Sequence, residues 1–133
     1  MADPFSITTF ALTATYKLVT TIRDYKGHDK KARALKNEVQ DLVAVLQTLL
    51  NTIGDYPDVD FSSLSIPLEQ CGKTCVEYQK LILRVTAHSS DSSKSSVRDW
   101  ITTKYLGGDI SNFKEMLAGY RSTINIALAN INM

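Results

Sequence analysis

Few residues of this chain have the chemistry for catalysis or metal binding. Its two histidines, His28 and His88, stand in a polar turn and beside a serine-rich segment, and neither has a Cys or Asp partner at a triad-like spacing. Cys71 and Cys75 lie one helical turn apart, but two ligands do not complete a zinc site, and a disulfide between such positions would strain a helix. We therefore expect buried free thiols, with a redox role as the alternative, and no catalytic residue, metal or cofactor.

Charged residues are a second candidate for binding chemistry, because the acidic and the basic ones gather in two separate regions of the chain. The acidic residues Asp55, Asp58, Asp60 and Glu69 follow one another without an intervening basic residue. The basic residues precede them along the chain and are Arg23, Lys26, Lys30, Lys31, Arg33 and Lys36. A helix of about 24 residues between the two groups would be roughly 36 Å long, so we expect a domain with opposite charges at its two ends.

The basic group has three interpretations. It could bind the headgroups of anionic lipids, bind an acidic protein surface, or do no more than keep a solvated helix start soluble. Only one aromatic residue, Tyr25, stands among the basic ones, and no recognition-helix pattern accompanies them, so nucleic acid is not expected as a partner.

The first helix is predicted over residues 4 to 23–25. Asp3 is a suitable N-cap, and Pro4 stands at the first helical position, where proline is favoured. Phe10 and Tyr16 widen the apolar face of this helix beyond one seam. We therefore expect other helices to surround it on most sides.

The rest of the chain alternates helices with polar connections. A second helix is predicted from Asp29 to Gly54, a loop over 55–66, and a third helix from about residue 66, with apolar positions up to Val85. A serine-rich connector at 89–96 leads to a short helix over 97–106, and the last helix starts at Asp109. Its apolar positions alternate in steps of three and four residues, which is typical of a helix packed against others: Ile110, Phe113, Leu117, Tyr120, Ile124, Ala127 and Ile131.

Composition indicates one soluble domain. A length of 133 residues is enough to bury a core, and 44% hydrophobic with 22% charged residues is ordinary for a globular protein. The first 25 residues lack the basic start and unbroken apolar run of a signal peptide, and no window approaches the roughly 20 apolar residues of a spanning helix. A cytoplasmic location is therefore expected. Because no capping signal ends the last helix, we also expect the natural protein to continue beyond Met133.

Three blocks of sequence resemble a known family. They are MADPFSI at the start, PLEQCGKTCVEYQKLI in the middle and WITTKYLGGDISNFKEMLAGYRSTINIALANIN at the end. Together they resemble the fungal N-terminal domain of azaphilone pigment cluster protein L, which also heads many NACHT and STAND receptor-like proteins. The resemblance implies a helical bundle related to HeLo-like domains of cell-death and heterokaryon-incompatibility proteins, and no known reaction. The motif positions in this chain are Cys71, Cys75, Trp100, Phe113, Leu117, Tyr120 and Ile124.

These observations predict one all-α domain over residues 1–133, an antiparallel bundle of four long helices and one short helix. We expect a non-enzymatic N-terminal signalling or effector module that acts by helix-mediated association, with itself or with downstream domains of the same polypeptide. One alternative is a membrane-active domain that engages anionic lipid from a peripheral position. Another is a binder of a small molecule or lipid linked to secondary metabolism.

Overall fold

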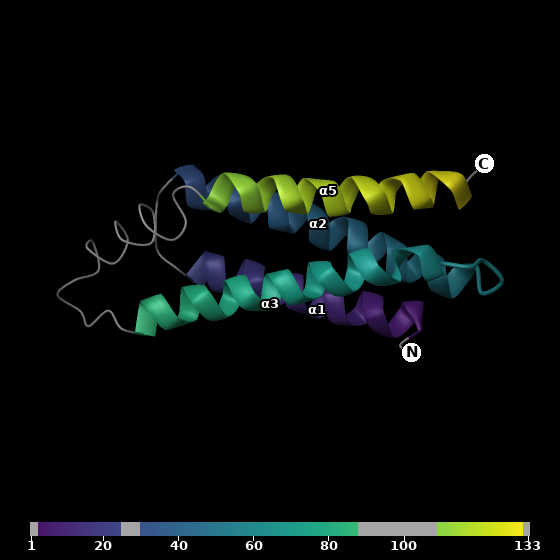
Figure 1. The fold of residues 1–133 in the computed structure, drawn as a ribbon, viewed down its shortest axis with the longest axis horizontal. Coiled ribbons are helices and arrows are strands. Elements are labelled where there is room, and N and C mark those ends of the chain that lie inside the picture. Colours follow the sequence, from purple (N-terminus) through teal and green to yellow (C-terminus); the bar gives the residue numbers. More distant parts are fainter. Residues whose placement is uncertain (1–2, 25–29, 88–108, 132–133) are drawn as a thin grey trace.

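The computed structural model describes residues 3–24, 30–87 and 109–131, and all regular structure in these ranges is helical (Figure 1). The four long helices are α1 (Pro4–Asp24), α2 (Lys30–Asp55), α3 (Ser65–Ala87) and α5 (Asp109–Ile131). A short 3-10 helix, η1 (Ser62–Leu64), lies in the segment predicted as a loop. The all-α prediction is confirmed. The predicted short helix over 97–106 and Trp100 lie outside the described residues.

The start of α1 follows from its capping residues. The backbone N–H of Ser6 donates a 2.7 Å hydrogen bond to Oδ1 of Asp3, so the carboxylate satisfies one of the unpaired donors of the first turn. Thr8 and Thr15 are buried on this helix, and their hydroxyls donate to the carbonyls of residues four positions earlier, at 2.6 and 2.9 Å. Both polar side chains can therefore enter the core without leaving a donor unpaired.

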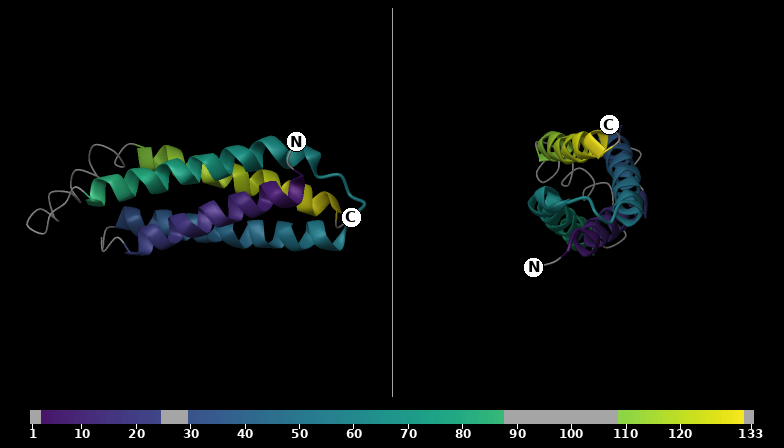
Figure 2. Two further views of the ribbon diagram at one scale, coloured as in Figure 1. Left: turned by 90° about the horizontal axis from the view of Figure 1, so that it is seen from below. Right: turned by 90° about the vertical axis from the view of Figure 1, so that its right-hand side faces the viewer.

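The long helices lie side by side, and their directions alternate along the chain (Figures 1 and 2). In space, α1 lies between α2 and α3, while α5 packs on α2 and has a smaller contact with α3. Consecutive helices α1 and α2 are antiparallel, as expected, but the packed pairs α1/α3 and α2/α5 run in the same direction. The segment between α2 and α3 produces this arrangement, because it crosses the end of the molecule and places α3 beside α1.

The core lies between α1, α2 and α3 and extends under α5. Phe113, Leu117 and Ile124 are buried, and so are Cys71 and Cys75. Tyr120 is only partly buried, although the apolar spacing places it in the seam, and Leu128 near the end of the helix is also only partly buried. The limited contact of α5 with α3 explains the difference, because the flank of α5 away from α2 is covered less fully.

Two close contacts join α3 to its neighbours. The rings of Tyr78 and Phe113 are stacked, with centroids 3.6 Å apart and planes inclined by 6°, and this contact ties α3 to α5. Gly72 of α3 faces Phe10 of α1 so closely that a Cβ atom at residue 72 would lie 2.3 Å from Cε2 of the ring. Among the described helices, none has the length and apolar character needed to cross a bilayer.

Candidate interaction surfaces

The basic residues are placed where α1 ends and α2 begins. Arg23 is exposed near the end of α1, Arg33 is exposed in α2, and Lys36 is half-buried one turn further. Lys30 and Lys31 are the first two residues of α2, so the helix itself fixes their backbone at the same end of the molecule. Their side chains, and the whole of Lys26, lie outside the described residues.

The acidic residues are placed at the opposite end, where α2 ends and α3 begins (Figure 1). Asp55, Asp58, Asp60 and Glu69 are all exposed there. Glu69 pairs with Lys73 on the same helix, with Oε1 and Nζ 3.0 Å apart, so its charge is locally balanced. The Ser62 hydroxyl and the Ser62 backbone N–H hold the pKa of Asp60 below its usual value, and the N–H donates at 2.9 Å. Asp60 therefore faces solvent as a carboxylate.

A hollow of about 420 Å³ opens beside these aspartates. The segment after α2 contributes Tyr56, Val59 and Asp60 to its wall, and the end of α5 contributes Ala127, Asn130 and Ile131. The lining is thus mainly apolar, and its polar side chains include Asp60, Ser63 and Asn130. Neither the hollow nor the part played in it by α5 follows from the sequence pattern, because the two segments are about 70 positions apart and only the fold brings them together.

A second concave surface, the α1/α2 groove, has a volume of about 590 Å³. Its apolar part is formed by Leu12 and Tyr16 of α1 with Val43 and Ala44 of α2. The remaining lining residues are polar: Thr13, Lys17, Gln40 and Gln47. Tyr16, in this groove, is 61% exposed, and Phe10, which faces Gly72 of α3, is 42% exposed, so the expectation that other helices surround α1 on most sides is wrong at both positions. Every residue that lines the groove belongs to α1 or α2, and no other described helix contributes to its wall.

The two cysteines are buried inside the molecule and are not bonded to each other. A hydrogen bond with Cys71, together with burial, raises the pKa of the Cys75 thiol well above its usual value. The thiolate is the form that attacks electrophiles and binds metals, so this environment makes Cys75 unreactive. Within the described ranges, no group of three or more His, Cys, Asp or Glu side chains is arranged to hold a metal ion.

Alkylation should therefore be slow for both thiols in the folded protein and fast in denaturant. A Ser122→Cys variant supplies the matched control, because Ser122 is exposed on α5 and its replacement should react at once under native conditions. The measurement is the rate of maleimide labelling, resolved by mass spectrometry. Rapid native labelling of Cys71 and Cys75, or stoichiometric zinc by elemental analysis, would contradict the buried-thiol assignment.

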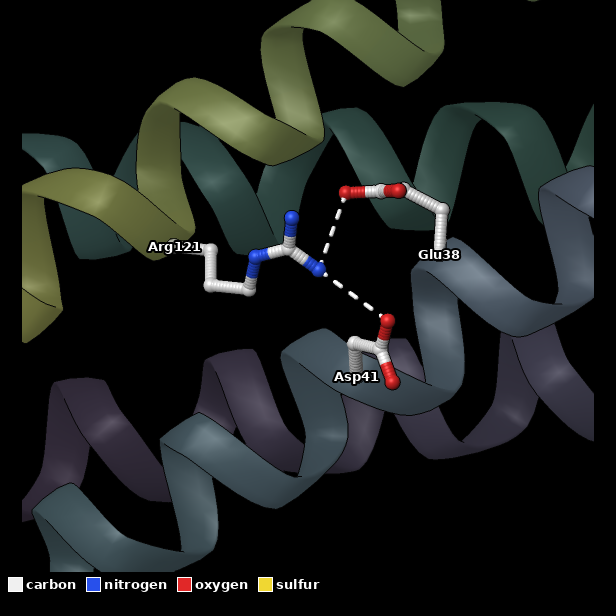
Figure 3. A network of polar contacts seen from close by, with 3 residues as sticks. All are labelled: Glu38, Asp41 and Arg121. Carbon is white, nitrogen blue, oxygen red and sulfur yellow. Dashed lines mark hydrogen bonds and ion pairs between the residues drawn. The ribbon is translucent and has the colours of Figure 1, made fainter.

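An ionic contact that the sequence reasoning missed holds α5 against α2 (Figure 3). Nη1 of Arg121 lies 3.1 Å from Oδ2 of Asp41 and 3.2 Å from Oε1 of Glu38. Only the Asp41 contact has hydrogen-bond geometry; the Glu38 oxygen is buried and pairs with the guanidinium through charge alone. Arg121 and Asp41 are partly exposed, so the contact should orient α5 more than it stabilises the fold. The sequence signal for this contact is the three-residue spacing of Glu38 and Asp41, which places both acids on one face of a helix.

Comparisons with known proteins support one part of the family resemblance. Neither the curated proteins nor the solved structures contain a match to the chain. A family model does match, over residues 2–133, and this range includes both cysteines and the whole of α5. The chain therefore belongs to the family described as pigment biosynthesis cluster protein PigL N-terminal.

Proposed function

We propose that this domain is a non-enzymatic association module of a fungal signalling or effector protein, and that it binds a second copy of itself through the α1/α2 groove. The observation that carries the proposal is the open groove whose lining includes the largely exposed ring of Tyr16. The same surface has a projecting aromatic side chain and an apolar depression. A two-fold pair needs this combination, because each copy must present both parts to the other.

The chemistry of the groove suits contact between helices. Burial of the Tyr16 ring against Leu12 and Val43 of the other copy would remove apolar surface from water, and each buried aromatic side chain contributes about 1.5–3 kcal/mol. Gln40 and Gln47 at the edge can exchange hydrogen bonds across the interface. Lys17 from the two copies would approach with like charges, so added salt should strengthen this contact.

The signalling role rests on the family resemblance. Domains of this type at the head of NACHT and STAND receptor-like proteins, and the proposed relation to HeLo-like domains of cell-death proteins, suggest a module whose pairing brings downstream segments together. Membership of a pigment-cluster family is compatible with such a role, since it describes where a member is encoded and not what the domain binds.

The test is sedimentation velocity over a range of protein concentrations, without lipid and at high salt. The wild-type domain should move from monomer to dimer as its concentration rises. Ala44→Arg places a long charged side chain in the groove and should weaken the dimer at least tenfold. Ala129→Arg makes the same change at an exposed alanine of α5 and should have no effect.

Other outcomes would favour the alternatives. A monomer at every concentration would contradict the association role, and equal dimerisation of both variants would remove the groove from it. Co-sedimentation of a monomeric domain with anionic vesicles would support the membrane-active alternative.

A further inference from the structure

We propose that the acidic end of one copy binds the basic end of another, so that copies of the domain associate head to tail along their long axes. This inference rests on the proposed function, and it adds to that function a second contact with a different chemistry. The groove contact is apolar and two-fold, whereas the end contact is ionic and joins unlike surfaces.

The charges at the ends of α2 oppose the stability of that helix. The helix begins with Lys30 and Lys31, has no acidic residue in its first turn and no basic residue in its last, and finishes at Asp55. The helix dipole favours the reverse arrangement, with acids at the start and bases at the end. These side chains therefore weaken the isolated helix while adding to the field of its dipole at both ends. A charge pattern of this kind is better suited to recognition between molecules than to folding.

The acidic end has a surface that fits a basic side chain. Tyr56 and Val59 are large and exposed there, and both line the hollow together with Asp60. Lysine and arginine have an apolar stem and a cationic head. The stem can lie on Tyr56 and Val59 while the head meets the carboxylate of Asp60, and the tyrosine ring adds a favourable contact with a cation.

The complementary surface is present on the same chain. Arg23 and Arg33 are exposed at the other extreme of the long axis, next to the start of α2. The long helices run lengthwise between the two ends, so the described acidic and basic residues lie at opposite extremes of the long axis (Figure 2). Because a contact between these ends joins unlike surfaces, it continues as an open chain of molecules unless the rotation between copies closes it.

Two charge-reversed variants test the inference. One is Lys30→Glu/Lys31→Glu, which lowers the summed charge of the six basic residues from +6 to +2; the other is Asp55→Lys/Asp58→Lys, which brings the summed charge of the four acidic residues from −4 to zero. All four changes stand in or next to the terminal turns of α2, and those at residues 30, 31 and 55 suit its dipole, so the fold should be kept. Both are made in the Ala44→Arg background, which removes the groove contact, and association is followed by sedimentation velocity at low and high salt.

The parent Ala44→Arg protein should form end-to-end oligomers at low salt and lose at least tenfold in affinity at high salt, because exposed charges are screened over about 8 Å at physiological ionic strength. Each double variant alone should stay monomeric, and an equal mixture of the two should associate again. This recovery in the mixture identifies the partner surface as the opposite end of the same domain.

The other results each overturn one proposal. A parent protein that stays monomeric at low salt, variants that associate as well as the parent, or a mixture that fails to recover would overturn the end contact and leave the groove result standing. Vesicles of anionic lipid are the last probe: binding lost in the Lys30→Glu/Lys31→Glu variant, without any self-association of the parent, would assign the basic end to a membrane surface instead. If the wild-type domain forms no dimer at high salt but the Ala44→Arg protein associates at low salt as expected, the groove contact is overturned and the end contact stands.

Discussion

Replacing Leu117 by Ala is expected to lower the free energy of unfolding by about 2–5 kcal/mol, because the change removes three carbon atoms from a fully enclosed site. Leu117 lies at the middle of α5 and has no exposed surface. The substitution would leave a cavity between α5 and the core. The more the surrounding side chains relax into this cavity, the smaller the loss of stability within this range.

Urea denaturation followed by circular dichroism measures the effect, and Ile126→Ala on the same helix is its control. Ile126 is 62% exposed, so the control removes a similar apolar side chain from a site that already contacts water. Its effect should stay within about 0.5 kcal/mol. Equal denaturation midpoints for the wild type and Leu117→Ala would show that α5 is not packed as the structure has it.

The positions of the helices follow from local sequence features. Asp3 and Pro4 fix the start of α1, and the apolar steps from Phe113 to Ile124 fix the buried face of α5, because capping and helical spacing act over a few residues. The bounds of α1 and the start of α5 agree with those predicted, and the bounds of α2 and α3 differ by one or two residues. The 3-10 helix at Ser62–Leu64 was not predicted, since three residues give no periodic signal.

The neighbours of each helix do not follow from such features. An apolar face predicts burial, but it does not say which partner covers it, and the parallel pairing of α1 with α3 depends on how the connection after α2 crosses the end of the molecule. The same limit applies to the candidate surfaces. The charge segregation could be predicted because the residues are close in sequence, whereas the groove and the hollow arise from helices distant in sequence.

Gly72 illustrates this limit most clearly, and it leads to the second large effect. The local sequence offers no reason for glycine inside α3, where alanine would stabilise an isolated helix by about 1 kcal/mol. The structure supplies the reason, because a Cβ atom here would lie 2.3 and 2.6 Å from two carbons of the Phe10 ring. Glycine allows α1 and α3 to approach, and Phe10 is the side chain that occupies the space.

Gly72→Ala should therefore destabilise the protein by about 1–3 kcal/mol, the usual cost of overpacking, although alanine is the better helix former. Gly119→Ala is the matched control, since a Cβ atom at residue 119 of α5 meets no other atom within 4 Å. That change should raise the free energy of unfolding, by up to about 1 kcal/mol.

The decisive measurement is a double-mutant cycle with Phe10→Ala. With the ring removed, the clash disappears and only the helix propensity remains, so Gly72→Ala should change sign and become stabilising. The two substitutions should couple by about 1–3 kcal/mol, the range found for residues in direct contact. If Gly72→Ala is equally harmful with and without the ring, glycine is needed for some reason other than the approach of α1 to α3.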